Sequence, residues 1–324
     1  MKRRDFLGVV AGAAAAWPIA ARAQPSSIPA IGVLGSASAR GFAPQLEAFR
    51  KSLGRAGYVE GRNVAIEYRW ADSDYGRLPK LAEELIKSRV DVIVASGPPA
   101  AVAAKAATAT IPVVFVAGFD PVGAGIVASL SHPGGNLTGF YLYIGGLVAK
   151  KLELLREMAP ELTRFAVLVN PRNPSAKLDA SEIEIASRTG FQAQTINAGT
   201  DAEINSVYAE LSGRKAAAII GTDTFYFDHR ESIVAVAAQR RVPTIYYARE
   251  FVTAGGLMSY GANISDVYLQ AAVYVARVLK GEKPSEMPVQ QPTTFEFVLN
   301  LKTAKALDLE IPPTLVARAD EVIE

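Results

Sequence analysis

The chain has 324 residues, with 34 lysines and arginines, 32 aspartates and glutamates, two histidines and no cysteine. The lack of cysteine excludes disulfides, a thiol nucleophile and cysteine-based metal sites, and two histidines cannot supply a multi-histidine metal site. The near balance of charge leaves no basic excess to neutralise phosphates, which argues against nucleic acid as a partner. We therefore expect no metal, no cofactor and a chain long enough for two domains.

The N-terminal residues 1–23 have the pattern of an export signal. A basic head precedes an Ala/Gly/Val-rich stretch, and residues 21–23 (Ala-Arg-Ala) supply the small-x-small pattern that signal peptidase cuts. The run Arg-Arg-x-Phe-Leu at residues 3–7 favours the twin-arginine class, with an ordinary Sec signal as the alternative. We expect cleavage between Ala23 and Gln24, which leaves a periplasmic protein with a formal charge of −1.

Short apolar runs predict four strands in each half of the remaining chain. They are Ala30–Leu34, Val64–Trp70, Val90–Ala95 and Pro112–Ala117, followed by Phe165–Val169, Phe191–Ile196, Ala217–Ile220 and Pro243–Tyr247. The segments between them show helical periodicity, as at Leu46, Phe49 and Leu53. The inner runs are continuously apolar, which is typical of parallel strands covered by helices on both faces. The pattern predicts an α/β protein with two doubly wound, Rossmann-like lobes.

The chain is expected to cross between these lobes three times, near Leu137–Leu142, Leu257–Gly261 and Pro288–Phe295, which together form a multi-strand hinge. Lobe one is then residues 27–140 plus 262–287, and lobe two is residues 141–259 plus 290–324. Ligands of open parallel sheets bind beyond the carboxyl ends of the strands. Two facing lobes would therefore place both sets of strand ends around one cleft.

Three candidate site residues follow strands of lobe one. Ser96 and Gly97 end a strand and precede a helix that starts at Pro98, where free backbone N–H groups and the Ser96 hydroxyl would receive a ligand carboxylate. The alternative for Ser96 is capping of that helix. Phe119, at the end of the next strand, is expected to line the cleft, while Asp120 is better placed to cap a helix.

The candidates of lobe two are Asn170, Asp223, Tyr226, Tyr246, Glu250 and Tyr260. Asp223 would bind a ligand ammonium or cap the following segment, and Asn170 would hydrogen-bond the ligand or hold its turn. Tyr226 or Phe225 would cover an apolar or aromatic ligand side chain. Tyr246 and Glu250 follow the last strand; Glu250 is a second candidate for the ammonium unless Arg249 pairs with it. Tyr260 would contact the ligand or nearby backbone.

Nine short stretches give the chain a resemblance to a known family. They are Asp91–Gly97, Ala107–Pro112, Asp120–Ile126, His132–Gly139, Lys151–Leu155, Ser259–Asn263, Gly281–Pro284, Asn300–Leu307 and Arg318–Glu324. In this order they resemble the exported substrate-binding proteins of ABC transporters, which have the type I periplasmic-binding fold. More narrowly, the chain is similar to the subfamily described as tryptophan/tyrosine-type.

The resemblance implies capture of a small molecule outside the inner membrane by a protein that is not an enzyme. It also implies delivery to an ABC transporter permease, and a monomer is the expected state for this class. The first loop, residues 35–40, borders the cleft in such folds, so Ser36 is a further candidate ligand-binding residue. This loop lacks the Pro-x-Leu-Asp stretch of many relatives, which weakens the transfer of their ligand preference.

The expected function is capture of a small zwitterion by cleft closure, with an amino acid, aromatic ones included, as the best candidate. An extracytoplasmic ligand sensor for a signalling receptor is the first alternative. A hydrolase is a weaker one, because no Gly-x-Ser-x-Gly elbow occurs and His132 lies in a Pro-Gly-Gly turn.

Overall fold

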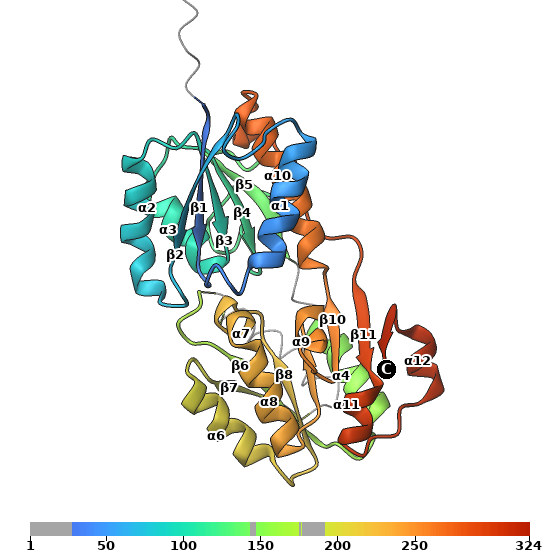
Figure 1. Ribbon diagram of the computed structural model, residues 1–324. Helices are drawn as coiled ribbons and strands as arrows, with labels where there is room; N and C mark the ends of the chain where they lie inside the picture. Colours follow the sequence, from blue (N-terminus) through green and yellow to red (C-terminus); the bar gives the residue numbers. More distant parts are fainter. Residues whose placement is uncertain (1–27, 143–146, 175, 177–191) are drawn as a thin grey trace, which may run out of the picture.

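The computed structural model describes residues 28–142, 147–174, 176 and 192–324 (Figure 1). The predicted export signal and the first residue of the strand expected at Phe191–Ile196 lie outside these residues. The described chain forms two α/β lobes, each with one sheet between two layers of helices. Among the described residues, no helix combines the length and apolar character that crossing a bilayer requires.

The sheet of lobe one has five parallel strands in the order β2-β1-β3-β4-β5. They are β1 (Ala30–Gly35), β2 (Ala65–Trp70), β3 (Val92–Ser96), β4 (Val113–Ala117) and β5 (Leu137–Tyr141). Helices α1 (Ala43–Arg55) and α10 (Ile264–Leu279) cover one face, and α2 (Leu78–Lys87) and α3 (Pro98–Ala107) cover the other. Short 3₁₀ turns occupy Tyr75–Arg77 and Pro284–Glu286.

The sheet of lobe two has seven strands in the order β12-β11-β10-β9-β8-β6-β7, and within it only β10 and β11 are antiparallel. They are β6 (Arg164–Val169), β7 (Gln192–Asn197), β8 (Ala216–Ile220), β9 (Thr244–Tyr246), β10 (Met258–Gly261), β11 (Glu296–Asn300) and β12 (Glu321–Ile323). One face carries α4 (Leu147–Met158), α11 (Leu301–Ala306) and α12 (Pro313–Arg318). The other carries α6 (Asp201–Leu211), α8 (Arg230–Arg240) and α9 (Arg249–Thr253), with α7 (Thr224–Asp228) at the boundary between the lobes.

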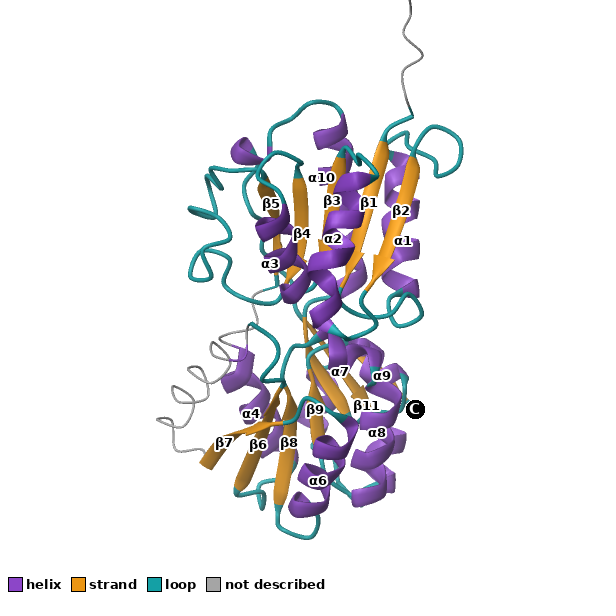
Figure 2. Ribbon diagram, turned by 90° about the vertical axis from the view of Figure 1, so that its left-hand side faces the viewer, coloured by secondary structure: helices purple, strands orange, loops and turns teal. Residues whose placement is uncertain are grey.

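The doubly wound fold class is confirmed, and the predicted strands recur with ends shifted by one or two residues. The structure adds β5 and β10 at two of the predicted crossings and β11 and β12 near the C-terminus. The chain leaves the first sheet after β5, returns after β10, and enters the second sheet again at β11. Figure 2 shows the two sheets arranged end to end, with the loops that follow their parallel strands between them.

Candidate functional site: a cavity between the lobes

A cavity lies where the strand ends of the two lobes meet. We call it the aromatic cavity. It spans about 370 Å³, including space that is open to solvent, and is lined by Phe42, Gly97, Pro98, Val116, Gly118, Leu142, Thr222, Asp223, Thr224, Phe227, Tyr247, Ile264 and Tyr268. A second space of about 310 Å³, the hinge cavity, shares Leu142, Thr222, Tyr247 and Ile264 with it and adds Leu147, Lys151, Gly261 and Ala262. Because the two cavities share four lining residues, they form the two ends of one site.

Aromatic rings from both lobes enclose the aromatic cavity. Lobe one contributes Phe42 and Tyr268, whose ring centroids are 6.0 Å apart, and lobe two contributes Phe227 and Tyr247, at 6.5 Å. The rings of Phe42 and Phe227 meet across the boundary at 5.0 Å. Such rings offer a large apolar surface with preferred packing geometry, so the cavity suits a flat apolar or aromatic group.

Two charged side chains line the site among the residues that the structure describes. Lys151 lies in the hinge cavity and Asp223 in the aromatic cavity, and they are 1% and 2% exposed. Thr222 belongs to both cavities, and its buried hydroxyl has no hydrogen-bond partner among the described residues. The site therefore combines one positive charge, one negative charge and a free hydroxyl with apolar walls.

The carboxylate of Asp223 is held by donors of the protein itself. Its Oδ1 accepts the backbone N–H of Phe225 at 2.6 Å, the Tyr75 hydroxyl at 2.6 Å and Nδ2 of Asn170 at 3.3 Å. Nδ2 of Asn173 donates to Oδ2. Asp223 thus caps α7, which was the alternative role predicted for it. Asn170 donates to Asp223 and also accepts the N–H of Arg172 within its own turn. Burial raises the pKa of Asp223, and these donors oppose that rise.

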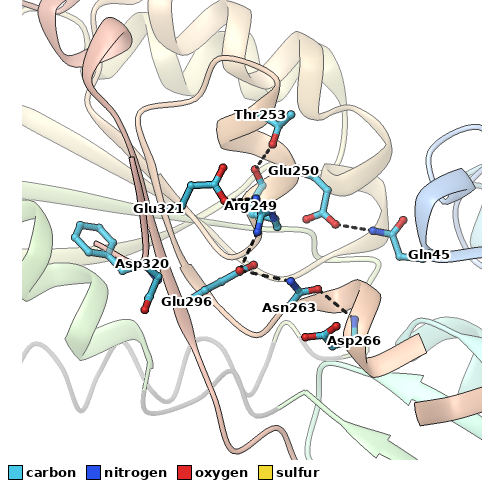
Figure 3. A network of polar contacts seen from close by, with 10 residues as sticks. Gln45, Arg249, Glu250, Thr253, Asn263, Asp266, Glu296, Asp320 and Glu321 are labelled. Atoms are coloured by element: carbon cyan, nitrogen blue, oxygen red, sulfur yellow. Dashed lines mark hydrogen bonds and ion pairs between the residues drawn. The ribbon is translucent and has the colours of Figure 1, made fainter. Parts of the chain in front are cut away.

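Polar contacts join the lobes outside the cavity as well. The backbone N–H of Ser38 donates to Asp228 at 3.1 Å, the hydroxyl of Ser38 also donates to it, and the Ser73 hydroxyl does so at 3.3 Å. Nε2 of Gln45 on α1 donates to Oε1 of Glu250 on α9 at 2.6 Å (Figure 3). The lobes are therefore in direct contact, with carboxylates of lobe two accepting hydrogen bonds from neutral donors of lobe one.

The start of α3 differs from the expected anion site. Pro98 and Pro99 have no N–H, the N–H of Ala100 donates to the Ser36 hydroxyl at 3.1 Å, and that of Ala101 donates to Gly97. No free N–H of this turn remains for a ligand carboxylate. Ser36, and not Ser96, caps the helix.

Ser96 instead pairs its hydroxyl with that of Tyr268. Gly97 lines the cavity as expected, with a φ of 96° that favours glycine. A Cβ at Gly97 would also meet Cγ2 of Thr224, in the other lobe, at 2.7 Å. Glycine at this position therefore permits the lobes to approach.

The predicted aromatic lining was displaced by one residue in three places. Phe119 is buried in the core against α2 and α3, and Gly118 lines the cavity instead. Tyr226 is fully buried and donates to the carbonyl of Ala198 at 2.6 Å, whereas Phe227 reaches the cavity. Likewise, Tyr246 stacks on Phe251 at 4.7 Å, and its neighbour Tyr247 lines the site.

Glu250 and Tyr260 do not line either cavity. Glu250 accepts the hydrogen bond from Gln45 at the boundary between the lobes, and burial raises the pKa of its carboxyl group. Arg249 pairs with Glu296 at 3.2 Å and with Glu321, not with Glu250 (Figure 3). Tyr260 is half-buried, with its ring 6.2 Å from that of Phe295.

Four residues at the boundary between the lobes were not predicted from the sequence: Phe42, Tyr75, Lys151 and Tyr268. A usable signal existed for Lys151, which lies four residues from both Leu147 and Leu155 and therefore on the apolar face of α4. The others reach the boundary from loops or from α10, and their proximity to lobe two follows only from the packing of the lobes.

The family model described as ABC transporter substrate binding protein matches residues 30–323. The chain belongs to this family. Membership places it among binding proteins and not among enzymes. A curated relative, the tyrosine-binding protein of Clostridioides difficile, is 28% identical over 263 residues, which cover 81% of this chain and 76% of the relative.

Two solved relatives show how the lobes are arranged. A Streptococcus pneumoniae ABC domain in complex with L-Trp is 26% identical and superposes with a TM-score of 0.84. The aligned region covers 92% of this chain and all of the relative. A ligand-free, open substrate-binding protein from Clostridium difficile is 27% identical, with coverages of 91% and 99%, but its TM-score is 0.66. Identity and coverage differ by only one percentage point between the two, and the ligand-bound relative superposes better. More distant solute-binding proteins, at 12–16% identity, share the type I periplasmic-binding fold alone.

Proposed function

We propose that this protein captures an aromatic amino acid outside the cytoplasmic membrane and delivers it to the permease of an ABC importer. The observation that carries the proposal is the site between the lobes, where four aromatic rings, one ammonium and one carboxylate surround a single space. A zwitterion with an aromatic side chain complements this combination. The relatives named for tyrosine and bound to L-Trp support the same ligand class.

Closure of the lobes provides the mechanism of capture. Phe42 and Phe227 come from opposite lobes, so the ligand can be enclosed only when the lobes meet. A ligand stabilises the closed state by as much as it prefers that state over the open one. Micromolar binding corresponds to about 8 kcal/mol, of which burial of one aromatic side chain supplies roughly 2–3 kcal/mol.

The ligand ammonium is assigned to Asp223. Among the described residues, Asn173 is the donor to its Oδ2, so the carboxylate keeps acceptor capacity toward the cavity that it lines. The export signal read at residues 1–23 and the periplasmic location fit this role, because an importer receives its solutes on that side.

Isothermal titration of the chain without residues 1–23 tests the proposal. L-tryptophan, L-tyrosine and L-phenylalanine are compared with L-leucine, L-lysine, a pentose and inositol. We expect micromolar or tighter binding of at least one aromatic amino acid and at least tenfold weaker binding of the others. Tighter binding of a sugar, or no binding of any aromatic amino acid, would contradict it.

A further inference from the structure

We propose that Lys151 and Thr222 form the subsite for the ligand carboxylate, at the hinge end of the site. This inference rests on the proposed function and names the residues that recognise the acidic group of the amino acid. The ligand side chain would then point toward Phe42 and Phe227. The ligand would lie along the axis that joins the hinge cavity to the aromatic cavity.

The position of Lys151 carries the first step. Its side chain is 1% exposed and lines the hinge cavity beside Leu147 and Tyr247. Its ammonium group is a positive charge on a residue of the cavity wall. A carboxylate brought into the cavity would lie close to this charge in surroundings where electrostatic attraction is stronger than in water.

Thr222 carries the second step. Its hydroxyl is buried, has no partner among the described residues, and lies in the wall that both cavities share. A hydroxyl can donate to a carboxylate while Lys151 supplies the charge. Thr222 also precedes Asp223 in the chain, so the subsites for carboxylate and ammonium would be adjacent, as the two groups of an α-amino acid require.

The other cationic side chains near the boundary, Arg230 and Arg249, line neither cavity. The first turn of α3 has no free N–H. Arg249 is paired with Glu296 and Glu321. Arg230 donates to the carbonyl of Phe227 at 2.8 Å and to that of Gly41 at 3.4 Å. Lys151 is the cation that faces the cavity among the described residues.

The test compares three related ligands by isothermal titration: L-tryptophan, tryptamine, which lacks the carboxylate, and indole-3-propionate, which lacks the ammonium. The wild type should bind L-tryptophan far more tightly than either analogue. Lys151→Met, which keeps the length and apolar stem, should weaken L-tryptophan binding by at least thirtyfold and tryptamine binding by less than threefold. Lys150→Met, at a half-exposed neighbour paired with Glu153, is the matched control and should change neither.

Thr222→Val keeps the shape and removes the hydroxyl, so it supports the test if Lys151→Met folds poorly. It should weaken L-tryptophan about fivefold and leave tryptamine unchanged. Equal losses for both ligands, or unchanged L-tryptophan binding in folded Lys151→Met, would overturn the inference while leaving the proposed function intact. If the wild type prefers another amino acid, that amino acid and its decarboxylated amine decide the question in the same way. If it binds only solutes without a carboxylate, both proposals fall.

Discussion

The hydroxyl of Tyr75 in lobe one lies 2.6 Å from Oδ1 of Asp223 in lobe two and also accepts the N–H of Phe225 at 3.1 Å. Tyr75 therefore contributes to the cap of α7 from across the boundary. This contact joins the two lobes, so it requires them to be close together, and its acceptor Asp223 lines the aromatic cavity. It couples closure directly to the residue that we assign to the ligand ammonium.

Tyr75→Phe removes this hydroxyl and keeps the ring. A hydrogen bond to a charged group contributes about 1.5–3 kcal/mol, so we expect a ligand affinity at least tenfold lower. Isothermal titration measures the loss. Tyr68→Phe is the control, because the Tyr68 hydroxyl contacts Arg50 and Glu60 within lobe one. Equal affinities of Tyr75→Phe and the wild type would show that the contact does not stabilise the closed state.

Gly41→Ala should hold the lobes apart. A Cβ at Gly41 would meet Oδ1 of Asp228, in the other lobe, at 2.0 Å. The backbone of Gly41 does not have a positive φ, so alanine fits its conformation, and within lobe one the atom nearest to the Cβ would be Oγ of Ser38, at 3.3 Å, which can shift slightly. We expect an unchanged melting temperature without ligand and a loss of ligand-induced stabilisation. Gly54→Ala on α1, where a Cβ meets nothing within 4 Å, should keep the full ligand-induced stabilisation, with a slightly higher melting temperature because alanine favours the helix. Full ligand response in Gly41→Ala would contradict the closed geometry.

Phe227→Ala tests the aromatic wall. The substitution removes a ring that faces the cavity and meets Phe42 across the boundary. We expect a loss of roughly 2–3 kcal/mol in the binding of an aromatic amino acid, from lost burial. The affinity for L-leucine should fall less, so the ratio of the two dissociation constants is the measurement. A parallel loss for both ligands would indicate a general effect on closure.

Asp223→Ala should weaken ligand binding at least tenfold, because it removes the carboxylate assigned to the ammonium. It should also lower the free energy of unfolding by about 2–4 kcal/mol, since the cap of α7 is lost and the buried amides of Asn170 and Asn173 lose their acceptor. Calorimetry and thermal unfolding separate the two effects. An unchanged affinity for L-tryptophan would remove Asp223 from the binding site.

Glu250 should make closure depend on pH. Burial raises its pKa in the closed form and the nearby Glu296 adds to this, while Arg230 and Arg249 oppose it. In an open form, solvent would return the pKa toward its ordinary value. The contribution of Glu250 to closure is then greatest at low pH and is lost as the pH rises through the closed-form pKa.

The variant Glu250→Gln isolates this effect, because it keeps an acceptor for Gln45 and cannot titrate. Relative to the wild type, Glu250→Gln should bind ligand progressively more tightly as the pH rises from 5 to 8. Glu231→Gln, at an exposed position on α8, provides the control. A ratio of affinities that stays constant with pH would contradict the assignment.

The sequence predicted the strands well because parallel strands that are buried on both faces leave continuous apolar runs, as in β3 and β8. The sequence also placed Gly97 and Asp223 at strand ends, and both residues line the aromatic cavity. The aromatic side chains were harder, because consecutive residues point in different directions. At the end of β9, Tyr246 points into the core and Tyr247 into the cavity, and strand ends must be located to within one residue to distinguish them.

The start of α3 could not be resolved from the sequence either. The predicted anion site needed free backbone N–H groups in the first turn of the helix. Ser36, which is distant in the sequence, accepts the N–H of Ala100 and so removes one of them. Contacts of this kind depend on how β1 and β3 pair, and those between Tyr75 and Asp223 depend on how the lobes close. Local patterns contain neither piece of information.

Small-angle X-ray scattering of the chain without residues 1–23, with and without saturating L-tryptophan, tests the central claim most directly. Capture by closure predicts that the radius of gyration of the wild type decreases on addition of the ligand, toward the value calculated from the structure described here. Gly41→Ala should show no decrease. If calorimetry shows binding of L-tryptophan to the wild type but the scattering curves with and without it coincide, closure around the ligand is contradicted.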